Sequence, residues 1–257
     1  MYGKSEDRDD YQDIPRPVGG MARDLPDRHY IPPHAHRRDQ LIYGASGAIT
    51  VITTEGTWVV PPQRAVWVPA GVEHATRTCG PVPMRTLYIE PSAQATPPTR
   101  CMVISVSPLA RELIIACTRM PTEYEESGRD GKVVSLLLDE LVPAPVLPLH
   151  LPMPHNPGLA RLCTRIMAEP EQEWTFAESA RIAHLSERTL ARRFRAETGW
   201  SLGRWRQQAR LLTAVQLLAG GNTIGMTASQ LGYHSPSAFT AMFRKTLGVA
   251  PSQYFTA

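Results

Sequence analysis

The pattern of hydrophobic and polar positions divides the chain into a strand-like part and a helical part. Between about Asp27 and Pro91, short runs of β-branched and aromatic residues alternate with Gly and Pro, and such runs predict strands. The predicted strands are Leu41–Tyr43, Ile49–Thr53, Thr57–Val60, Ala65–Val68 and Arg85–Ile89, with a hairpin turn at Glu55–Gly56. Several short strands at close spacing are typical of a sandwich or a small barrel.

From Ser107 onward the period of the pattern becomes helical. Residues 109–117 carry one apolar stripe and residues 133–141 carry another. Prolines then recur between residues 143 and 154, so we expect this segment to act as a semi-stiff spacer rather than a helix. These changes place a domain boundary near residues 150–157.

Beyond residue 157 the helical signals are dense, and one short segment occurs twice. Ser186–Arg195 is echoed 49 positions later by Ser235–Arg244, and each copy is followed by a glycine, Gly199 or Gly248. In each copy the serine is placed to cap a short helix and the glycine to end it. Each copy follows another short helix, and a long helix joins the two copies. This arrangement predicts a tandem helix-turn-helix reader of DNA.

Charge is distributed unequally between the two parts. The residues from 155 onward hold twelve Lys and Arg and six Asp and Glu, whereas the rest of the chain holds fifteen and eighteen. The helical part therefore carries about +6 and the remainder about −3. This distribution fits a phosphate-backbone binder joined to a separate sensing or dimerising domain.

Other features of the composition narrow the class of protein. The four cysteines are scattered without a CxxC pair, as in a reduced cytosolic protein. No stretch approaches the roughly 20 apolar residues of a membrane span, and the first residues are too polar for a secretory signal. We therefore expect a cytoplasmic protein with no membrane partner, whose residues 1–24 form a flexible leader.

The chain from about Pro157 to Ala257 closely resembles the C-terminal domain of AraC/XylS-family transcription regulators. LSERTLARRFRAETGWSLGRW and LGYHSPSAFTAMFRKTLGVAPSQYF match that family's pattern almost end to end. The resemblance implies that the second helix of each motif enters the major groove of double-stranded DNA. Two residues depart from the pattern: His184 replaces a turn glycine, and Thr227 replaces a small apolar core residue.

The same resemblance implies which side chains face the DNA. The base-facing positions are Arg188, Thr189, Ala191 and Arg192 in the first motif and Ser237, Thr240 and Ala241 in the second. An arginine can give guanine two hydrogen bonds, which discriminate by roughly 1–3 kcal/mol, so we expect the first motif to provide most direct readout. The candidate phosphate contacts are Arg193, Arg195, Arg206, Arg210, Arg244 and Lys245. For each of them the alternative is a solvated surface charge.

The strand-like part carries a second resemblance, to the two motifs of cupins. His34–Ala35–His36 is followed by Gln40, and Pro69–Ala70–Gly71–Val72–Glu73–His74 comes later. The resemblance implies a small barrel in which His34, His36, Gln40 and His74 surround one cavity. Three neutral imidazoles there can hold a divalent transition metal such as Zn, Ni, Fe or Mn. Gln40 replaces the usual Glu, and the loss of its negative charge should lower the metal affinity.

Three roles of this cluster stay open at the level of the sequence. It can hold a metal ion, bind a small-molecule effector directly, or satisfy itself as a structural group. Tyr30, Tyr43 and Trp67 are further candidates to line the effector pocket.

Together these patterns predict an α+β protein of two domains. Residues 25–150 would form a cupin-like β-barrel with flanking helices for effector sensing and dimerisation, and residues 157–257 an all-α tandem helix-turn-helix domain. The expected function is a ligand-responsive transcription regulator, acting as a homodimer through helices between Ser107 and Val142, with RNA polymerase as a candidate partner. An effector would act by shifting the population of two arrangements.

Two other functions remain as alternatives. The first is a metal-dependent cupin enzyme fused to a DNA reader, which would need an acid or base near an open metal position. The second is a constitutive DNA-bending protein with an inert barrel.

Overall fold

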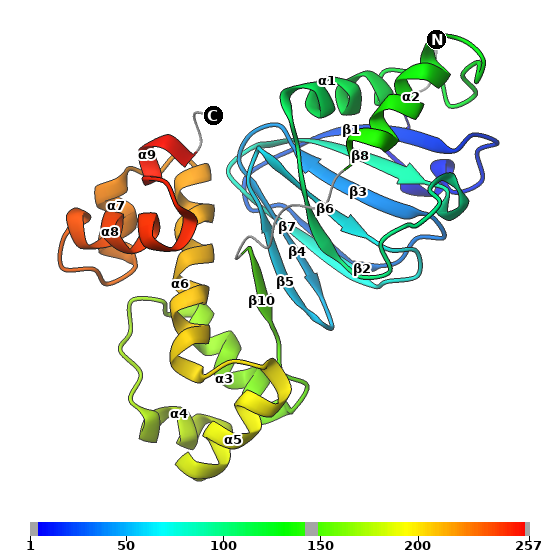
Figure 1. Cartoon of the computed structure of the whole chain (residues 1–257). Coiled ribbons are helices and arrows are strands. Elements are labelled where there is room, and N and C mark those ends of the chain that lie inside the picture. Colours follow the sequence, from blue (N-terminus) through cyan, green and yellow to red (C-terminus); the bar gives the residue numbers. More distant parts are fainter. Residues whose placement is uncertain (1–4, 142–148, 255–257) are drawn as a thin grey trace. The chain divides into compact units, whose positions relative to one another are not determined.

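The computed structural model describes residues 5–141 and 149–254. The chain separates into two compact units (Figure 1), one built from Met1–Val51 and Val60–Leu147 and the other from Ile52–Val59 and Pro148–Ala257. In the described ranges, no helix has the length and apolar character needed to cross a membrane.

The strands of the described residues form two five-stranded sheets. The first has the order β1 (Val18–Leu25), β8 (Val82–Ile89), β3 (Asp39–Gly44), β6 (Arg64–Val68) and β9 (Met102–Ser105). The second has the order β10 (His150–Pro152), β5 (Gly56–Val60), β4 (Ala48–Thr53), β7 (His74–Cys79) and β2 (Tyr30–His34). Each of the five strands predicted from the sequence is present, and the cupin-like fold is confirmed.

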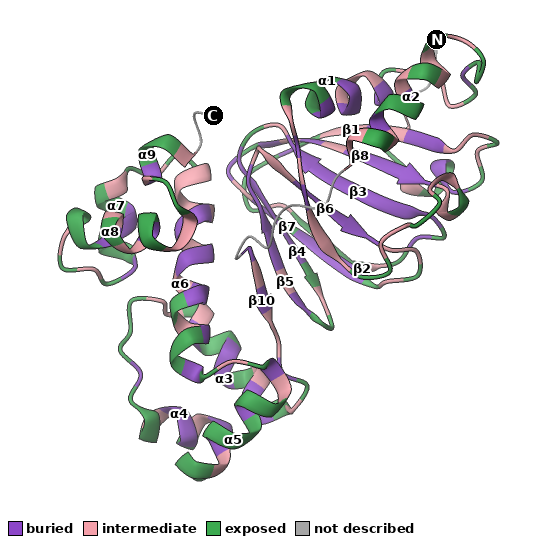
Figure 2. Ribbon diagram, in the orientation of Figure 1, coloured by how far each residue is buried: buried purple, intermediate pink, exposed green. Residues whose placement is uncertain are grey.

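Two helices cover the outer face of the first sheet (Figure 1): α1 (Pro108–Cys117) and α2 (Arg129–Glu140). Ser107 caps α1, because its Oγ accepts a hydrogen bond from the amide of Ala110 at 3.0 Å. The helices bury their apolar stripes against the strands in one cluster that includes Leu41, Tyr43 and Trp67. Figure 2 shows the buried residues along β3 and β8 beneath these helices.

The expectation of a flexible leader over residues 1–24 is wrong for its described part. Residues 8–11 form a short 3-10 helix, η1 (Arg8–Tyr11), and β1 pairs antiparallel with β8 along its whole length. Tyr11 is buried and its ring stacks on that of Tyr88, with 5.6 Å between the centroids.

A single buried arginine anchors this polar segment. The guanidinium of Arg38 donates hydrogen bonds to the carbonyl oxygens of Gln12, Ile14 and Arg16 at 3.1, 2.7 and 2.8 Å. Local composition does not reveal such long-range bonds to backbone carbonyls. A segment with few apolar residues is therefore predicted to be disordered even where these bonds order it.

The second unit contains the predicted tandem of helix-turn-helix motifs. Its helices are α3 (Pro157–Ala168), α4 (Phe176–Ala183), α5 (Glu187–Thr198), α6 (Leu202–Ala219), α7 (Ile224–Gln230), α8 (Pro236–Leu247) and α9 (Pro251–Tyr254). Ser186 and Ser235 cap α5 and α8, and Gly199 and Gly248 end them with φ of 74° and 81°. His184 ends α4 with φ of 54°, so it adopts the left-handed conformation that its turn requires.

The proline-rich spacer is only partly within the described residues, since residues 142–148 lie outside them. The part that is described is a strand rather than a spacer: β10 pairs antiparallel with β5, with His150 opposite Trp58. The rings of these two residues stack with 4.6 Å between their centroids. Trp205 of α6 donates its indole N–H to the carbonyl of Pro152 at 2.7 Å, so tertiary bonds decide the conformation here.

Candidate functional site

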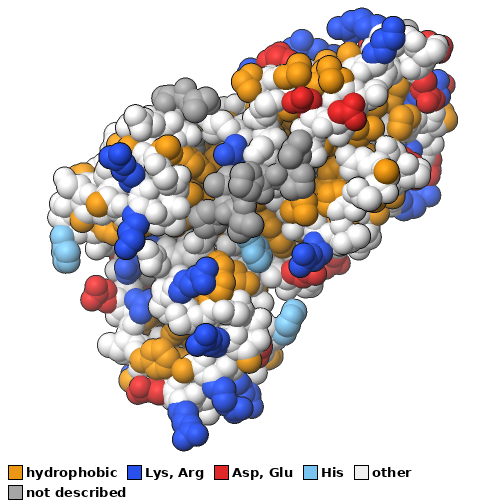
Figure 3. Space-filling view, in the orientation of Figure 1, with side chains coloured by type: hydrophobic (Ala, Val, Ile, Leu, Met, Phe, Trp, Pro, Cys, Tyr) orange, Lys and Arg blue, Asp and Glu red, His pale blue; other side chains and the backbone are white. Residues whose placement is uncertain are grey.

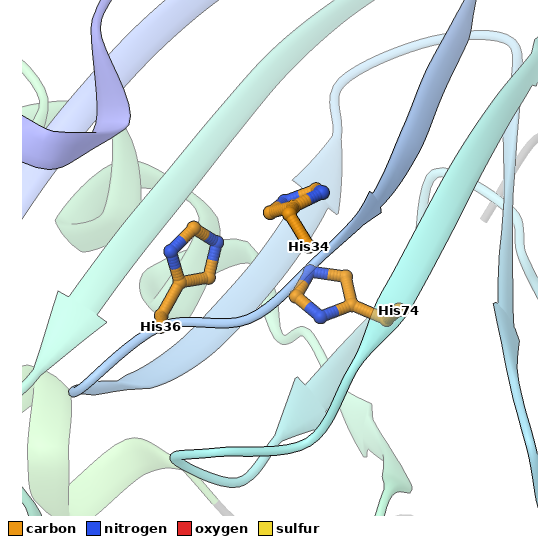
Figure 4. A group of neighbouring side chains, drawn as sticks. All are labelled: His34, His36 and His74. Carbon is orange, nitrogen blue, oxygen red and sulfur yellow. The ribbon is translucent and has the colours of Figure 1, made fainter.

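Three histidines meet at one end of the second sheet (Figure 4). His34 ends β2, His74 begins β7 directly opposite it in the register, and His36 lies in the loop after β2. Their ring centroids are 4.5, 4.8 and 5.3 Å apart. One nitrogen from each ring lies within 4.8 Å of the other two. Strand pairing therefore brings together the three histidines that the sequence singled out.

Backbone carbonyls define the tautomer of two of these rings. Nδ1 of His34 lies 2.7 Å from the carbonyl oxygen of Pro32, and Nδ1 of His74 lies 3.0 Å from that of Val72. A carbonyl can only accept, so Nδ1 carries the proton and Nε2 keeps its lone pair. Nε2 of His74 and both nitrogens of His36 are buried without a partner among the described residues. Such oriented lone pairs are what a metal ion or a hydrogen-bond donor needs.

The three rings are neutral near neutral pH. Burial, together with the neighbouring His34 and His74, lowers the pKa of His36 to about 3. Burial also lowers the pKa of His74 to about 4 and shifts the pKa of His34 downward. Neutral imidazole is the form that ligates metals. A cation can therefore bind in the cavity at neutral pH without first displacing protons from these rings.

Gln40 lies in the same cavity and is almost fully buried. Its Nε2 donates to Oγ1 of Thr86 at 3.0 Å and lies 3.5 Å from the hydroxyl of Tyr88. Its Oε1 is buried without a partner among the described residues. The cavity has a volume of about 520 Å³ and is lined by His34, His74 and Gln40 together with Ile42, Thr76 and Tyr88. It can therefore hold a small molecule beside the three imidazoles.

The three aromatic residues proposed as pocket residues lie elsewhere, so that prediction is wrong. Tyr43 and Trp67 are 1% exposed and pack in the cluster beneath α1 and α2. Because side chains alternate along a strand, Gln40 and Ile42 of β3 face the cavity and Tyr43 faces the helices. Tyr30 is 46% exposed, with the guanidinium of Arg77 5.6 Å from its ring centroid.

Sequence reasoning missed the contribution of β8 to the cavity. Met84 and Tyr88 line it, and Thr86 between them holds Gln40. The signal was present, because alternation along the predicted strand Arg85–Ile89 places Thr86 and Tyr88 on one face. It could not be used, since the sequence does not say which face of this strand meets the histidines.

The helix α5, which the sequence predicts to read DNA, presents its charged side chains to solvent. Leu190 and Phe194 of α5 are fully buried, whereas Arg188 and Arg192 are exposed. Thr189 is half-buried, and its Oγ1 accepts a hydrogen bond from the capping Ser186 at 2.9 Å. Within the described part of the chain, no ion pair is made by Arg188, Arg192, Arg193, Arg195, Arg244 or Lys245. Figure 3 shows Lys and Arg side chains gathered on the face of the helical unit.

The helix α8, the second one predicted to read DNA, brings its predicted residues together in one shallow hollow. Ser237, Thr240, Arg244 and Lys245 of α8 line it along with Ala241. Phe239 and Phe243, on the opposite side of the helix, are fully buried. The two helices therefore differ in chemistry, because α8 offers small side chains where α5 offers arginines.

Arg206 and Arg210 make hydrogen bonds within the protein that the sequence did not predict. Nη1 of Arg206 donates to the carbonyl of Trp174 at 2.6 Å, and Nε of Arg210 donates to that of Pro170 at 2.7 Å. Both guanidinium groups thus hold the loop between α3 and α4 against α6. These bonds use part of the five N–H donors of each guanidinium, and the phosphate contact of both residues stays a prediction.

Comparison with known proteins matches each unit to a family. A helix-turn-helix domain family matches residues 179–257, and a cupin domain family matches residues 21–90. Among solved structures, the DNA-binding domain of AdpA in complex with a target DNA is 30% identical, covering 38% of this chain and 90% of that one, with a TM-score of 0.36.

Curated relatives extend over both units. The chain is 41% identical over 224 residues to the HTH-type transcriptional regulator NimR of Escherichia coli strain K12, covering 87% of this chain and 81% of that protein. A putative AraC-like transcription regulator of Streptomyces lividans is 31% identical over 163 residues, covering 58% of this chain and 53% of that protein. The chain therefore belongs to the AraC/XylS family of helix-turn-helix transcription regulators, with a cupin-like domain preceding its DNA reader.

Proposed function

We propose that this transcription regulator reads its operator mainly with α5 and receives its signal in the three-histidine cavity. The observation that carries the proposal is a pair of capped helices with buried aromatic anchors and exposed basic side chains that lack ion-pair partners among the described residues. Basic groups without internal partners are free to neutralise phosphates and to reach base edges.

Readout of the bases is assigned to the first motif. Arg188 and Arg192 lie on the exposed side of α5, where a guanidinium can give two hydrogen bonds to guanine. The hollow on α8 suits phosphate oxygens at Arg244 and Lys245 and thymine methyl groups at Ala241. Arg193 and Arg195 remain proposed phosphate contacts on α5.

The cavity suits a divalent transition metal, with Zn, Ni, Fe and Mn as candidates. His34, His36, His74 and Gln40 would hold it, because each has a lone pair that is not used by the protein. A bound ion would supply a positive charge to which a small-molecule effector could bind. The carbonyls of Pro32 and Val72 orient the imidazoles of His34 and His74, and burial shields His36 and His74 from water.

Dimerisation through α1 and α2 is the second part of the proposal. Leu109 and Leu136 are 47% and 43% exposed, and a hollow between the helices is lined by Leu113, Val133 and Leu136. An apolar surface of this kind is suited to a second copy of the same helices. Leu136→Glu should convert a dimer to a monomer in light scattering, whereas Glu112→Gln should not. Contact with RNA polymerase is also proposed, as the step that would follow operator binding.

Regulation rather than catalysis is the proposed role of the cupin-like domain. An enzyme of this type needs an acid or base beside the open metal position, and the side chain at that place is the amide of Gln40. Stoichiometric iron in the purified protein together with oxygen consumption would support the enzyme alternative instead.

Genome-wide binding with and without candidate effectors, combined with elemental analysis, tests the whole proposal. We expect discrete promoter sites whose occupancy changes with effector or metal, and loss of that change in His34→Ala and His74→Ala. Occupancy that is the same under all conditions and in both variants would contradict sensing and favour the constitutive DNA-bending alternative.

A further inference from the structure

The hydroxyl of Thr86 distinguishes the two ends of the Gln40 carboxamide. Thr86 is fully buried on β8, and its hydroxyl donates to the carbonyl oxygen of Leu41 at 3.0 Å. A hydroxyl has one proton, so towards Gln40 its oxygen can only accept. It accepts from Nε2 of Gln40 at 3.0 Å. The NH2 end of the amide therefore faces Thr86, and the carbonyl end faces away from it.

The carbonyl oxygen of Gln40 is consequently presented without a partner of its own. Gln40 is 5% exposed and Oε1 has no hydrogen-bond partner among the described residues. The side chain lines the same cavity as His34 and His74. A buried acceptor of this kind is satisfied only by a group that brings a positive charge or a proton.

We propose that Thr86 locks Gln40 so that its carbonyl oxygen joins His34, His36 and His74 as an uncharged four-donor set, and that the effector held there is a small anion. This inference rests on the metal site of the proposed function. Three neutral imidazoles and one amide oxygen leave the two positive charges of a divalent ion unreduced. An anionic group, such as a carboxylate, is then the complementary ligand.

The acidic side chains that line the cavity do not cancel this charge, because two of the three have cationic partners. Glu6 lies 3.8 Å from the guanidinium of Arg23, and Asp9 lies 4.0 Å from that of Arg8. Asp7 caps η1 by accepting a hydrogen bond from the amide of Asp9. Among the described residues, the lining therefore keeps one unpaired negative charge, that of Asp7, against the two positive charges of a divalent ion, so the metal-loaded cavity stays net positive.

The positioning role of Thr86 is tested with Co²⁺ as the probe, on the full-length protein. Thr86→Val removes the hydroxyl at nearly constant volume, and Thr86→Ser keeps it as the matched control. We expect Thr86→Val to weaken Co²⁺ binding by about 10-fold to 100-fold and to shift the visible absorption bands, and Thr86→Ser to resemble wild type. Gln40→Met, which leaves Thr86 intact, should show the same loss if Thr86→Val does not fold.

Failure of the inference and failure of the metal site give different results. Wild-type affinity and spectrum in Thr86→Val would overturn the role of Thr86 while leaving the metal site in place. Absence of Co²⁺ binding to wild type would overturn both the role of Thr86 and the metal site. Binding of the protein to promoter DNA, measured separately, would then show whether the DNA-binding part of the proposed function still holds.

The charge of the site is tested with azide as a small anion. We expect azide to perturb the spectrum of the Co²⁺-loaded wild type and to bind several-fold more weakly to Gln40→Glu, because the carboxylate lowers the charge of the site by one. Equal azide affinity in the two proteins, or no azide binding to wild type, would overturn the assignment of an anionic effector.

Discussion

At the scale of single residues, the same residue type serves different purposes according to its partners. Arg188 is exposed on α5 and makes no ion pair among the described residues, whereas Arg38 is 4% exposed and holds three backbone carbonyls. A guanidinium whose donors are already used cannot bind phosphate. The number of unused donors, rather than the presence of an arginine, therefore separates a contact to DNA from a structural anchor.

Arg188→Ala should relax base specificity without unfolding the protein. The loss of a two-bond contact to guanine costs roughly 1–3 kcal/mol at one operator position and nothing at the others. Binding measured against a library of single-base operator variants checks this. Discrimination that is unchanged at every position would assign readout to other side chains.

Arg206 and Arg193 form a matched pair for separating structure from DNA binding. Arg206→Gln removes a charged hydrogen bond to Trp174 and should lower the free energy of unfolding by about 1.5–3 kcal/mol. The slope of log affinity against log salt should stay the same. Arg193→Gln should leave stability unchanged and reduce that slope by about one. Urea unfolding and salt titrations of operator binding measure both effects, and an exchange of the two results would refute the assignment.

At the scale of elements, short pieces of structure depend on what they pair with. The strand β10 has three residues, each opposite a residue of β5. The rings of one of these pairs stack, and Pro152 accepts a hydrogen bond from Trp205. A three-residue segment has no intrinsic stability as a strand, so its conformation follows from these contacts. The same holds for η1, which Tyr11 and Arg38 keep in place.

The stack of His150 on Trp58 predicts a pH dependence of stability. Burial lowers the pKa of His150 below its usual 6.5, so the unfolded chain takes up a proton at a pH where the folded protein does not. The free energy of unfolding should therefore decrease as the pH falls below about 6.5, by up to about 1.4 kcal/mol per pH unit.

Urea unfolding between pH 7 and pH 5 measures this effect. His150→Phe should reduce the slope because it keeps a ring on Trp58 and removes the titrating group. His155→Gln, at an exposed position, is the control. A slope that His150→Phe leaves untouched would attribute the pH dependence to other groups.

At the scale of the whole molecule, regulation requires that occupancy of the cavity and operator binding affect each other's free energy. Linkage makes this effect reciprocal: if a metal or effector changes operator affinity by some factor, the operator changes the affinity of that ligand by the same factor. Reciprocity distinguishes a regulator from a cupin-like domain that only accompanies a DNA reader.

The corresponding prediction compares two titrations of one protein. Co²⁺ affinity measured with and without operator DNA should change by the same factor as operator affinity measured with and without Co²⁺. Arg188→Ala should keep Co²⁺ affinity in the absence of DNA, and His36→Ala should keep operator affinity in the absence of metal. A metal that binds tightly but changes neither equilibrium would show that it is not the signal.

Local signals in the sequence were sufficient for the helical unit. Ser186, Gly199, Ser235 and Gly248 act on their own neighbours through caps and turns. The helices α5 and α8 and the exposure of Arg188 therefore follow from residues close in the chain. The three histidines could also be found, because their spacing in two short segments resembles a known pattern.

Tertiary structure alone decided what depends on pairing between distant segments. The sequence determined that a strand carries Tyr43 and that another carries Thr86, but only the order of the strands set which face meets the helices and which meets the cavity. Tertiary structure likewise bonded Arg206 of α6 to the loop between α3 and α4 and paired residues 18–25 with β8. The physical reason is that caps and periodicity act over a few residues, whereas register and buried polar bonds join residues tens of positions apart.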